Sequence, residues 1–523
     1  MLSGFGAGRL RGASLRPSLS ALVRLVLLAA VDLGLGVFAQ SLLDNGATLV
    51  AWFVVAIAVI ITVIFLSRRL YPLRWIAPGL ALLLLFVIYP VVNTVHTAFT
   101  NAGGGHLLTK DVALSQLAER TYTPQGDSPY AWTAYRADDG TFLLHLTRGG
   151  HAVFARSSGA HADLPTTAPA KPPASFEGYT RLTKIGSVRY LTELQNGGFR
   201  EVNGRPVAIT SLDEASEQRQ RYVYDSATDS VKDAQTGVVY TAKDGTFTSA
   251  IGVTLSPGYT ASVGTRNFSK ILTDPNVRGP FLGVFVWTFV FAGLSVLTCF
   301  ALGFVAALIL NDTKLPGRSF FRALVLTPYA LPIFIGASIW VGLLNPIYGP
   351  VNGLLDFFFG ISPSWFTDAN LAKGALILIG LWLGFPYMML ITLGALQSIP
   401  KDVYDAADID GAGRLGSFRY VTLPLVLASV SPILVGAFAF AFNNFTLIEL
   451  VTKGGPANVS TNTPAGHTDI LLSYTYRLAF TGGEGIDYGL AASVTMVIFL
   501  IVAAISLVNF RLTRRFRAIY DLA

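Results

Sequence analysis

The sequence predicts a mainly α-helical protein that crosses a membrane about eight times and carries one inserted, β-rich domain outside the membrane. Three observations indicate this fold class. Apolar residues make up 52% of the 523 residues and charged residues only 13%, whereas soluble chains average about 25% charged residues. Apolar runs of membrane-helix length recur along the chain. A long polar stretch, residues 101–276, separates the third run from the fourth and contains repeated turn signals.

Eight apolar runs match the about 20 residues that a helix needs to cross the hydrocarbon core. In chain order they are residues 24–43, 47–66, 75–97, 281–310, 323–344, 372–396, 426–450 and 488–510. The seventh run is the weakest, because it contains Asn443, Asn444 and Glu449. Arg24 and Asp32 in the first run are expected at the ends of the span, where charged side chains can reach the interface.

Basic residues in the short connections predict the orientation of these spans, because cytoplasmic loops carry an excess of Lys and Arg. If eight spans alternate, sixteen basic residues fall on one side: Arg9, Arg11, Arg16, Arg68, Arg69, Arg74, Lys314, Arg318, Arg322, Lys401, Arg414, Arg419, Arg511, Arg514, Arg515 and Arg517. We therefore expect both termini in the cytoplasm and the polar stretch outside. That stretch holds as many acidic as basic residues, so the net charge of +7 does not indicate a nucleic-acid-binding face.

An alternative exists for the first run. A basic N-terminal segment, an apolar run and Val37-Phe38-Ala39 loosely resemble a cleaved signal peptide. Cleavage would remove the first span and leave the others oriented as before. We favour a retained span, because the run is long and contains Asp32.

Three regions follow from this reading: residues 1–100 with three membrane helices, 101–276 as a β-rich exported domain, and 277–523 with five membrane helices. In the exported domain, turn signals such as Asp139-Gly140 and Asp244-Gly245 separate short β-prone runs, and residues 180–195 could be helical. A stretch of about 175 residues is long enough to bury a core of its own.

Catalytic and metal-binding motifs are not visible. The sequence contains no G-x-x-x-x-G-K-[ST] phosphate loop, no nucleophile elbow and no evident pair of catalytic carboxylates. His106, His145, His151 and His161 lie in the exported stretch without metal-ligand spacing, and we expect surface histidines there. The only cysteine, Cys299, excludes an intrachain disulfide and is expected to be a small buried residue.

The most informative segment is the predicted cytoplasmic connection at residues 400–424. Pro400 ends the sixth run, Asp402 is expected to cap a short helix with an acidic first turn, and Gly411 lies where that helix should end. A solvated loop helix would by itself explain an acidic run. The spacing is more specific, since the segment fits the pattern E-A-A-x3-G-x9-I-x-L-P with Asp in place of Glu and Val in place of Ile. The matching residues are Asp405, Ala406, Ala407, Gly411, Val421, Leu423 and Pro424.

This pattern resembles the EAA loop of permease subunits of binding-protein-dependent, ATP-driven importers. The resemblance implies that Asp405, Ala406, Ala407 and Gly411 belong to a coupling helix that docks into a cleft of a separate ATPase subunit. It implies no cofactor in this chain, because ATP and Mg²⁺ would be bound by the ATPase partner.

Four further segments, residues 382–389, 438–445, 463–469 and 472–477, are similar to the maltose/maltodextrin permease family, as is the order of eight spans with a large loop after the third. The likeness is close over residues 281–510 and rests on architecture alone elsewhere. It implies a sugar site midway through the membrane, at Tyr329, Leu383, Gly384, Tyr387, Phe440 and Asn444. Aromatic rings, an amide and phenols suit a carbohydrate, although polar residues in membrane helices often serve helix packing instead.

That family has polar residues where this chain has Gly380, Ala437 and Ala441, so the resemblance implies an oligosaccharide more firmly than maltose itself. The expected partners are a second permease, two copies of an ATPase and a soluble periplasmic sugar-binding protein at the bacterial inner membrane. A permease for a different sugar remains open. An ion-coupled secondary transporter would usually show inverted repeats or intramembrane acids, and a membrane assembly factor would not need the coupling-loop spacing.

Overall fold

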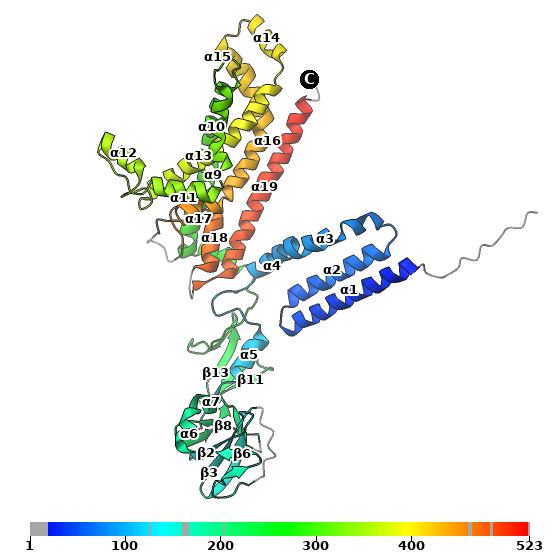
Figure 1. Ribbon diagram of the computed structural model, residues 1–523, viewed down its shortest axis with the longest axis vertical. Coiled ribbons are helices and arrows are strands. Elements are labelled where there is room, and N and C mark those ends of the chain that lie inside the picture. The colour runs from blue at the N-terminus through cyan, green and yellow to red at the C-terminus, as the bar shows by residue number, and fades with distance from the viewer. Residues whose placement is uncertain are drawn as a thin grey trace, which may run out of the picture. The chain divides into compact units, whose positions relative to one another are not determined.

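The computed structural model describes residues 19–124, 126, 128–158, 167–201, 204–458, 463–481 and 485–520. The chain divides into a helical unit, Met1–Gly104 with Ser262–Ala523, and a β-rich unit, Gly105–Ala261 (Figure 1). The predicted fold class is therefore confirmed. Residues 262–276, which the sequence analysis placed in the exported domain, belong to the helical unit. Of the arginines used to predict orientation, Arg9, Arg11 and Arg16 lie outside the described residues.

The N-terminal part of the helical unit begins with a helical hairpin, formed by α1 (Leu19–Asp44) and α2 (Thr48–Leu66). A short 3-10 helix, η1 (Tyr71–Trp75), follows. The third span then consists of α3 (Ala77–Leu83), the π-helix η2 (Leu84–Ile88) and α4 (Tyr89–Ala98). The expected position of Asp32 at a span end was wrong. Asp32 lies in the middle of α1, where Thr62 of α2 donates a hydrogen bond of 2.7 Å to its carboxylate.

Long helices form the core of the helical unit: α9 (Pro275–Asn311), α13 (Ala369–Ser398), α16 (Leu423–Phe442) and α19 (Tyr488–Tyr520). Helix α9 packs against α13 and α16, and α19 packs against α16 and α4. Among the described residues, seven helices are long and apolar enough to cross a membrane, and one bent pair would make eight. A polytopic membrane protein follows from this composition.

The bent pair is the fifth predicted span, and the expectation of one continuous helix at residues 323–344 was wrong. Helix α10 (Arg318–Ala330) and helix α11 (Ile333–Leu343) meet at 94°. The break falls at Leu331-Pro332, because proline has no N–H to continue a helix and biases the preceding residue towards an extended backbone. Leu331 has this extended conformation, with φ −84° and ψ 134°. The seventh run is also divided, since α16 ends at Phe442 and α17 (Phe445–Val451) follows.

Short helices complete the unit: α8 (Arg266–Thr273), α12 (Pro350–Phe359), α14 (Lys401–Ile409), α15 (Arg414–Ser417), η3 (Phe418–Thr422) and α18 (Leu471–Phe480). Helices α14 and α15 lie at the same end of the bundle as the C-terminal end of α19, and α17 and α18 lie at the other end (Figure 1). This agrees with the alternation of spans in the sequence-based topology, which placed residues 400–424 and the C-terminus on one side.

The β-rich unit contains one large antiparallel sheet in the order β3-β4-β7-β8-β9-β2-β6-β5, in which β3 also pairs with β2 and closes six strands into a ring. Strands β11 to β14 form a separate antiparallel meander, and β1 pairs with β10. The strands are β1 (Thr121–Tyr122), β2 (Tyr130–Arg136), β3 (Phe142–Arg148), β4 (His151–Arg156), β5 (Ser175–Phe176), β6 (Tyr179–Arg181), β7 (Phe199–Glu201), β8 (Pro206–Ile209), β9 (Glu214–Glu217), β10 (Arg219–Gln220), β11 (Tyr222–Asp225), β12 (Ser230–Asp233), β13 (Val239–Lys243) and β14 (Thr246–Ser249). The helices are α5 (Lys110–Ala118), α6 (Lys184–Arg189) and α7 (Leu191–Gln195), the last two within residues 180–195.

The expectation of surface histidines was wrong for His145, which is only 1% exposed. It packs edge-on against Phe154, with ring centroids 5.2 Å apart, and its Nε2 lies 2.8 Å from the carbonyl oxygen of Pro169. His151 is exposed, and His161 lies outside the described residues. No group of three or more potential metal ligands occurs within the described ranges.

Candidate functional site

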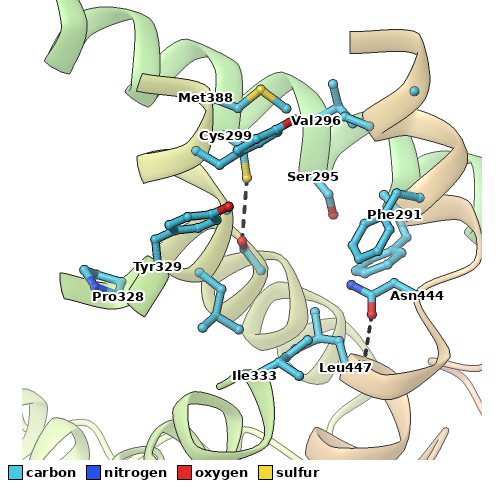
Figure 2. A pocket seen from close by; sticks show the side chains of 18 of the residues that line it. Phe291, Ser295, Val296, Cys299, Pro328, Tyr329, Ile333, Met388, Asn444 and Leu447 are labelled. Carbon is cyan, nitrogen blue, oxygen red and sulfur yellow. Dashed lines mark hydrogen bonds between the residues drawn. The ribbon is translucent and has the colours of Figure 1, made fainter. Parts of the chain in front are cut away.

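A cavity of about 700 Å³ lies within the helical unit and is lined by residues from α9, α10, α11, α13, α16 and α17 and from the breaks beside them. This volume is within the range of roughly 300–1,000 Å³ that is usual for small-molecule sites. All six residues proposed from the sequence lie on its wall: Tyr329, Leu383, Gly384, Tyr387, Phe440 and Asn444. The structure thus brings together positions that are more than one hundred residues apart in the sequence (Figure 2).

The break between α10 and α11 forms one wall of the cavity. Pro328, Tyr329, Leu331 and Ile333 all line it. A broken helix exposes backbone N–H and C=O groups, and such groups are tolerated at membrane depth where they are buried in protein or line a water-filled cavity. Discontinuous helices also surround the binding sites of many transporters. The bend therefore places hydrogen-bonding backbone beside this cavity.

The second break, between α16 and α17, explains the Asn443-Asn444 pair. Asn443 donates a hydrogen bond of 3.1 Å from Nδ2 to the carbonyl oxygen of Ala439 in its own helix. Asn444 caps α17, because its Oδ1 accepts a hydrogen bond of 3.2 Å from the N–H of Leu447. Only Asn444 lines the cavity, and Figure 2 shows its amide beside that space. Its oxygen is used by the cap, so its Nδ2 is the group that remains to donate to a ligand.

Aromatic side chains cover much of the cavity. The rings of Tyr329 and Tyr387 lie nearly parallel, 19° apart in orientation, with centroids separated by 6.0 Å. Phe440 lines the cavity and is 72% exposed. Rings exposed in this way can pack on an apolar ligand face, and the two phenols can donate and accept hydrogen bonds.

Glycines let the cavity helices approach closely. A Cβ on Gly384 would lie 2.9 Å from Sγ of Cys299 on α9, and a Cβ on Gly336 of α11 would lie 2.8 Å from Cδ2 of Leu383. Gly384 and Leu383 therefore have a packing role in addition to lining the cavity. Cys299 is buried, as expected, and also forms part of the cavity wall.

Every residue that lines the cavity is uncharged. The positions that carry small residues in this chain, Gly380, Ala437 and Ala441, all belong to the lining. Sequence reasoning missed the contribution of α9, from which Phe291 and Ser295 also line the cavity. Their spacing of four residues on one helix face was the signal that could have found them. The lining suits a neutral ligand and offers it a small number of side-chain hydrogen-bonding groups.

The predicted coupling residues lie at the far end of the bundle from α17 and α18 (Figure 1). Asp405 and Ala406 are exposed on α14, and Ala407 is half-buried. Gly411 ends the helix, as expected, with a left-handed φ of +79°. The capping role expected for Asp402 was wrong, because α14 already begins at Lys401 and Asp402 lies in its first turn.

The end of α14 is fixed by its own backbone. The N–H of Gly411 bonds to the carbonyl oxygen of Asp408 at 3.1 Å, and the N–H of Ala412 bonds to that of Ala407 at 2.9 Å. This pair of bonds is a Schellman motif, which requires a left-handed residue such as glycine at the turn. The adjoining side chains of Ile409 and Leu415 are 87% and 79% exposed. An exposed helix with apolar side chains at its end is suited to packing against another protein.

Two family descriptions match the chain. Residues 299–518 match the "Binding-protein-dependent transport system inner membrane component", and residues 81–157 match the "N-terminal of TM subunit in PBP-dependent ABC transporters". The first match contains α13, α14 and α16, and therefore most of the cavity and the whole coupling segment.

Full-length relatives give a closer comparison. The chain is 36% identical over 513 residues to the maltose/maltodextrin transport system permease protein MalF of Vibrio vulnificus strain YJ016, a match that covers 96% of this chain and 97% of the relative. It is 38% identical over 476 residues to MalF of Salmonella typhi, covering 86% and 88%. It is 37% identical over 468 residues to MalF of Escherichia coli O6:H1, again covering 86% and 88%.

Proposed function

The chain belongs to the MalF family of binding-protein-dependent transport permeases, and from this premise we propose that it carries maltose and maltodextrin-like oligosaccharides across the membrane as the permease subunit of an ATP-binding-cassette importer. The chain is a multi-pass membrane protein. The proposal assigns it to the bacterial inner membrane, with both termini in the cytoplasm and the β-rich unit in the periplasm.

The cavity is the observation that supports this function most directly. Oligosaccharides are neutral, with apolar ring faces and many hydroxyl groups. The cavity offers the ring of Phe440 and the paired rings of Tyr329 and Tyr387 for those faces, and an amide donor from Asn444 for the hydroxyls. We propose these four residues, with Leu383 and Gly384, as the sugar-binding residues. The absence of charge from the lining argues against an ionic substrate, because a buried charge requires a partner.

Energy would reach this cavity from outside the chain. We propose that the segment containing Asp405, Ala406, Ala407 and Gly411 docks into an ATPase subunit, and that closure of two ATPase copies around ATP and Mg²⁺ moves α14. Tyr404 connects α14 to the membrane helices, since its hydroxyl lies 3.2 Å from Oγ1 of Thr422 at the start of α16. A displacement of α14 would thereby reach a helix that lines the cavity.

The remaining proposed partners follow from the family. A second permease of the MalG type would complete the pore, two copies of a MalK-type ATPase would drive it, and a periplasmic sugar-binding protein would deliver the ligand. In this proposal the chain contains no metal, no cofactor and no ATPase site of its own. A permease for another sugar differs from this proposal only in the cavity ligand.

Reconstitution tests the function. The chain is inserted into proteoliposomes alone, with the three partner proteins, or with partners whose ATPase cannot hydrolyse ATP, and uptake of radiolabelled maltotriose is measured. We expect uptake only with the complete, active assembly. Uptake by the chain alone would instead favour an ion-coupled secondary transporter. ATP-driven uptake of a different sugar, with no uptake of maltotriose, would refute the substrate assignment.

A further inference from the structure

Helix α9 contributes four side chains to the cavity, Val296 and a row of three others. Phe291, Ser295 and Cys299 are spaced four residues apart, so they lie on one face of the helix, and all three line the cavity. None of them is among the six residues proposed above. Figure 2 shows Ser295 between Cys299 and Phe291, with its hydroxyl directed towards the space shared with Asn444.

The hydroxyl of Ser295 has no hydrogen-bond partner among the described residues, although the side chain is only 8% exposed. Thr392 of α13 is also buried without a partner, but of these two hydroxyls only Ser295 lines the cavity. On the same helix, Thr288 donates to the carbonyl oxygen of Val284 and Thr298 to that of Leu294, each at 2.7 Å. Serine can make the same bond to its own helix, but Ser295 does not. A buried hydroxyl without a partner is costly, so the position calls for a partner that enters the cavity.

The rest of the lining offers few competing polar groups. Apart from Ser295, the polar side chains of the cavity are Cys299, Tyr329, Tyr387 and Asn444. Sγ of Cys299 already lies 3.6 Å from the carbonyl oxygen of Gly380. On α9, therefore, Ser295 is the side chain that can both donate to and accept from a ligand hydroxyl.

We propose that Ser295 is a specificity-determining residue that exchanges a hydrogen bond with one hydroxyl of a neutral sugar in the cavity. The assignment rests on the function proposed above and adds α9 to the sugar-contacting walls. It makes the cavity selective for an oligosaccharide that presents a hydroxyl towards α9. A ligand lacking that hydroxyl would leave the Ser295 hydroxyl buried and unpaired, which is how a site rejects an analogue.

The test uses the complete assembly in nanodiscs, held with a non-hydrolysable ATP analogue, and measures equilibrium binding of radiolabelled maltotriose. We expect Ser295→Ala to weaken binding about fivefold, the effect of removing one neutral hydrogen bond. Ser295→Thr, which keeps the hydroxyl, should bind more tightly than the alanine variant. The matched control is Thr298→Val, because Thr298 lies on the same helix, bonds to its own backbone and does not line the cavity. The control should bind as the unaltered chain does.

A second measurement separates sugar contact from a structural role. Singly deoxygenated maltotrioses are tested in the same way, and one of them should lose affinity for the unaltered assembly but not for Ser295→Ala. Equal maltotriose affinity of the alanine variant and the unaltered assembly would overturn the assignment and leave the proposed function standing. Weakened binding by Ser295→Ala with the same loss for every deoxy sugar would also overturn it. No maltotriose binding by the unaltered assembly would refute the proposed function itself.

Discussion

The crossing of α9 and α13 can be tested at Gly303, where the two backbones approach closely. A Cβ on Gly303 would lie 2.7 Å from the backbone nitrogen of Met389 and 2.9 Å from the carbonyl carbon of Met388. Ordinary contacts between such atoms begin at about 3.5 Å, so Gly303→Ala must move the helices apart by roughly 0.8 Å. Backbone atoms cannot rotate away as a side chain can. Overpacking of this kind lowers the free energy of unfolding by about 1–3 kcal/mol.

The effect can be isolated with Gly283→Ala, an exposed position on the same helix where a new Cβ meets no atom within 4 Å. Alanine is favoured over glycine within a helix by about 1 kcal/mol, so this control should be neutral or slightly stabilised. The assay heats each purified variant in detergent and follows loss of the monodisperse peak by size-exclusion chromatography. We expect Gly303→Ala to unfold at a lower temperature than both the control and the unaltered chain. An unfolding temperature equal to that of Gly283→Ala would refute the argument that α9 and α13 require a glycine here.

Three further predictions concern the coupling helix, the cavity and the β-rich unit. Gly411→Pro should abolish coupled uptake but not membrane insertion, because proline cannot adopt a φ of +79° and removes the bond to Asp408; normal uptake by this variant would count against a docking role. Phe440→Ala should weaken maltotriose binding about tenfold, the order of an aromatic contact, and unchanged binding would remove Phe440 from the site. Burial alone would raise the pKa of the Asp233 carboxyl, but hydrogen bonds from Arg221 and from backbone N–H groups hold that pKa below its usual value. The stabilisation that the Asp233 carboxylate gives to the folded β-rich unit is therefore complete above about pH 4 and is lost as the pH falls through the lower folded-state pKa. The protection of β11 and β12 in the full chain against hydrogen exchange, relative to the intrinsic exchange rate at each pH, should fall in that range, and less steeply in Asp233→Asn.

The sequence predicted the membrane helices well where a span is one unbroken helix. The apolar run 281–310 lies within α9, and the run 372–396 lies within α13. These predictions succeeded because the length of an apolar run shows whether a helix can cross the hydrocarbon core. The prediction failed at the fifth span, because the mean hydropathy over about 20 residues does not register a single break in the helix. Pro332 is a signal for a bend, but the angle of 94° depends on how α10 and α11 pack against the other helices.

The candidate site was predicted in part. Six lining residues came from the resemblance to a family, and the structure places all six on one cavity. The resemblance did not include Ser295, and the sequence could not show that its hydroxyl is unpaired, because a serine in a membrane helix ordinarily bonds to its own backbone; the structure reveals that this one does not. The error at His145 has a similar cause. A polar residue in a short β-prone run gives no sign of whether its partner is water or, as here, a carbonyl oxygen of a neighbouring segment.

The two broken spans have a common explanation. Leu331 and Ile333 flank the first break and Asn444 lies at the second, and all three line the same cavity. Free backbone groups and a capping amide are costly in lipid but useful beside a ligand rich in hydroxyl groups. In the sequence the second break appeared as a weakness of the seventh span, marked by Asn443-Asn444, whereas the first break, at Pro332, was not recognised. An apolar run that polar residues interrupt, among several uninterrupted runs, therefore indicates where the cavity lies. A helix that only had to cross lipid would have no reason to be interrupted at that depth.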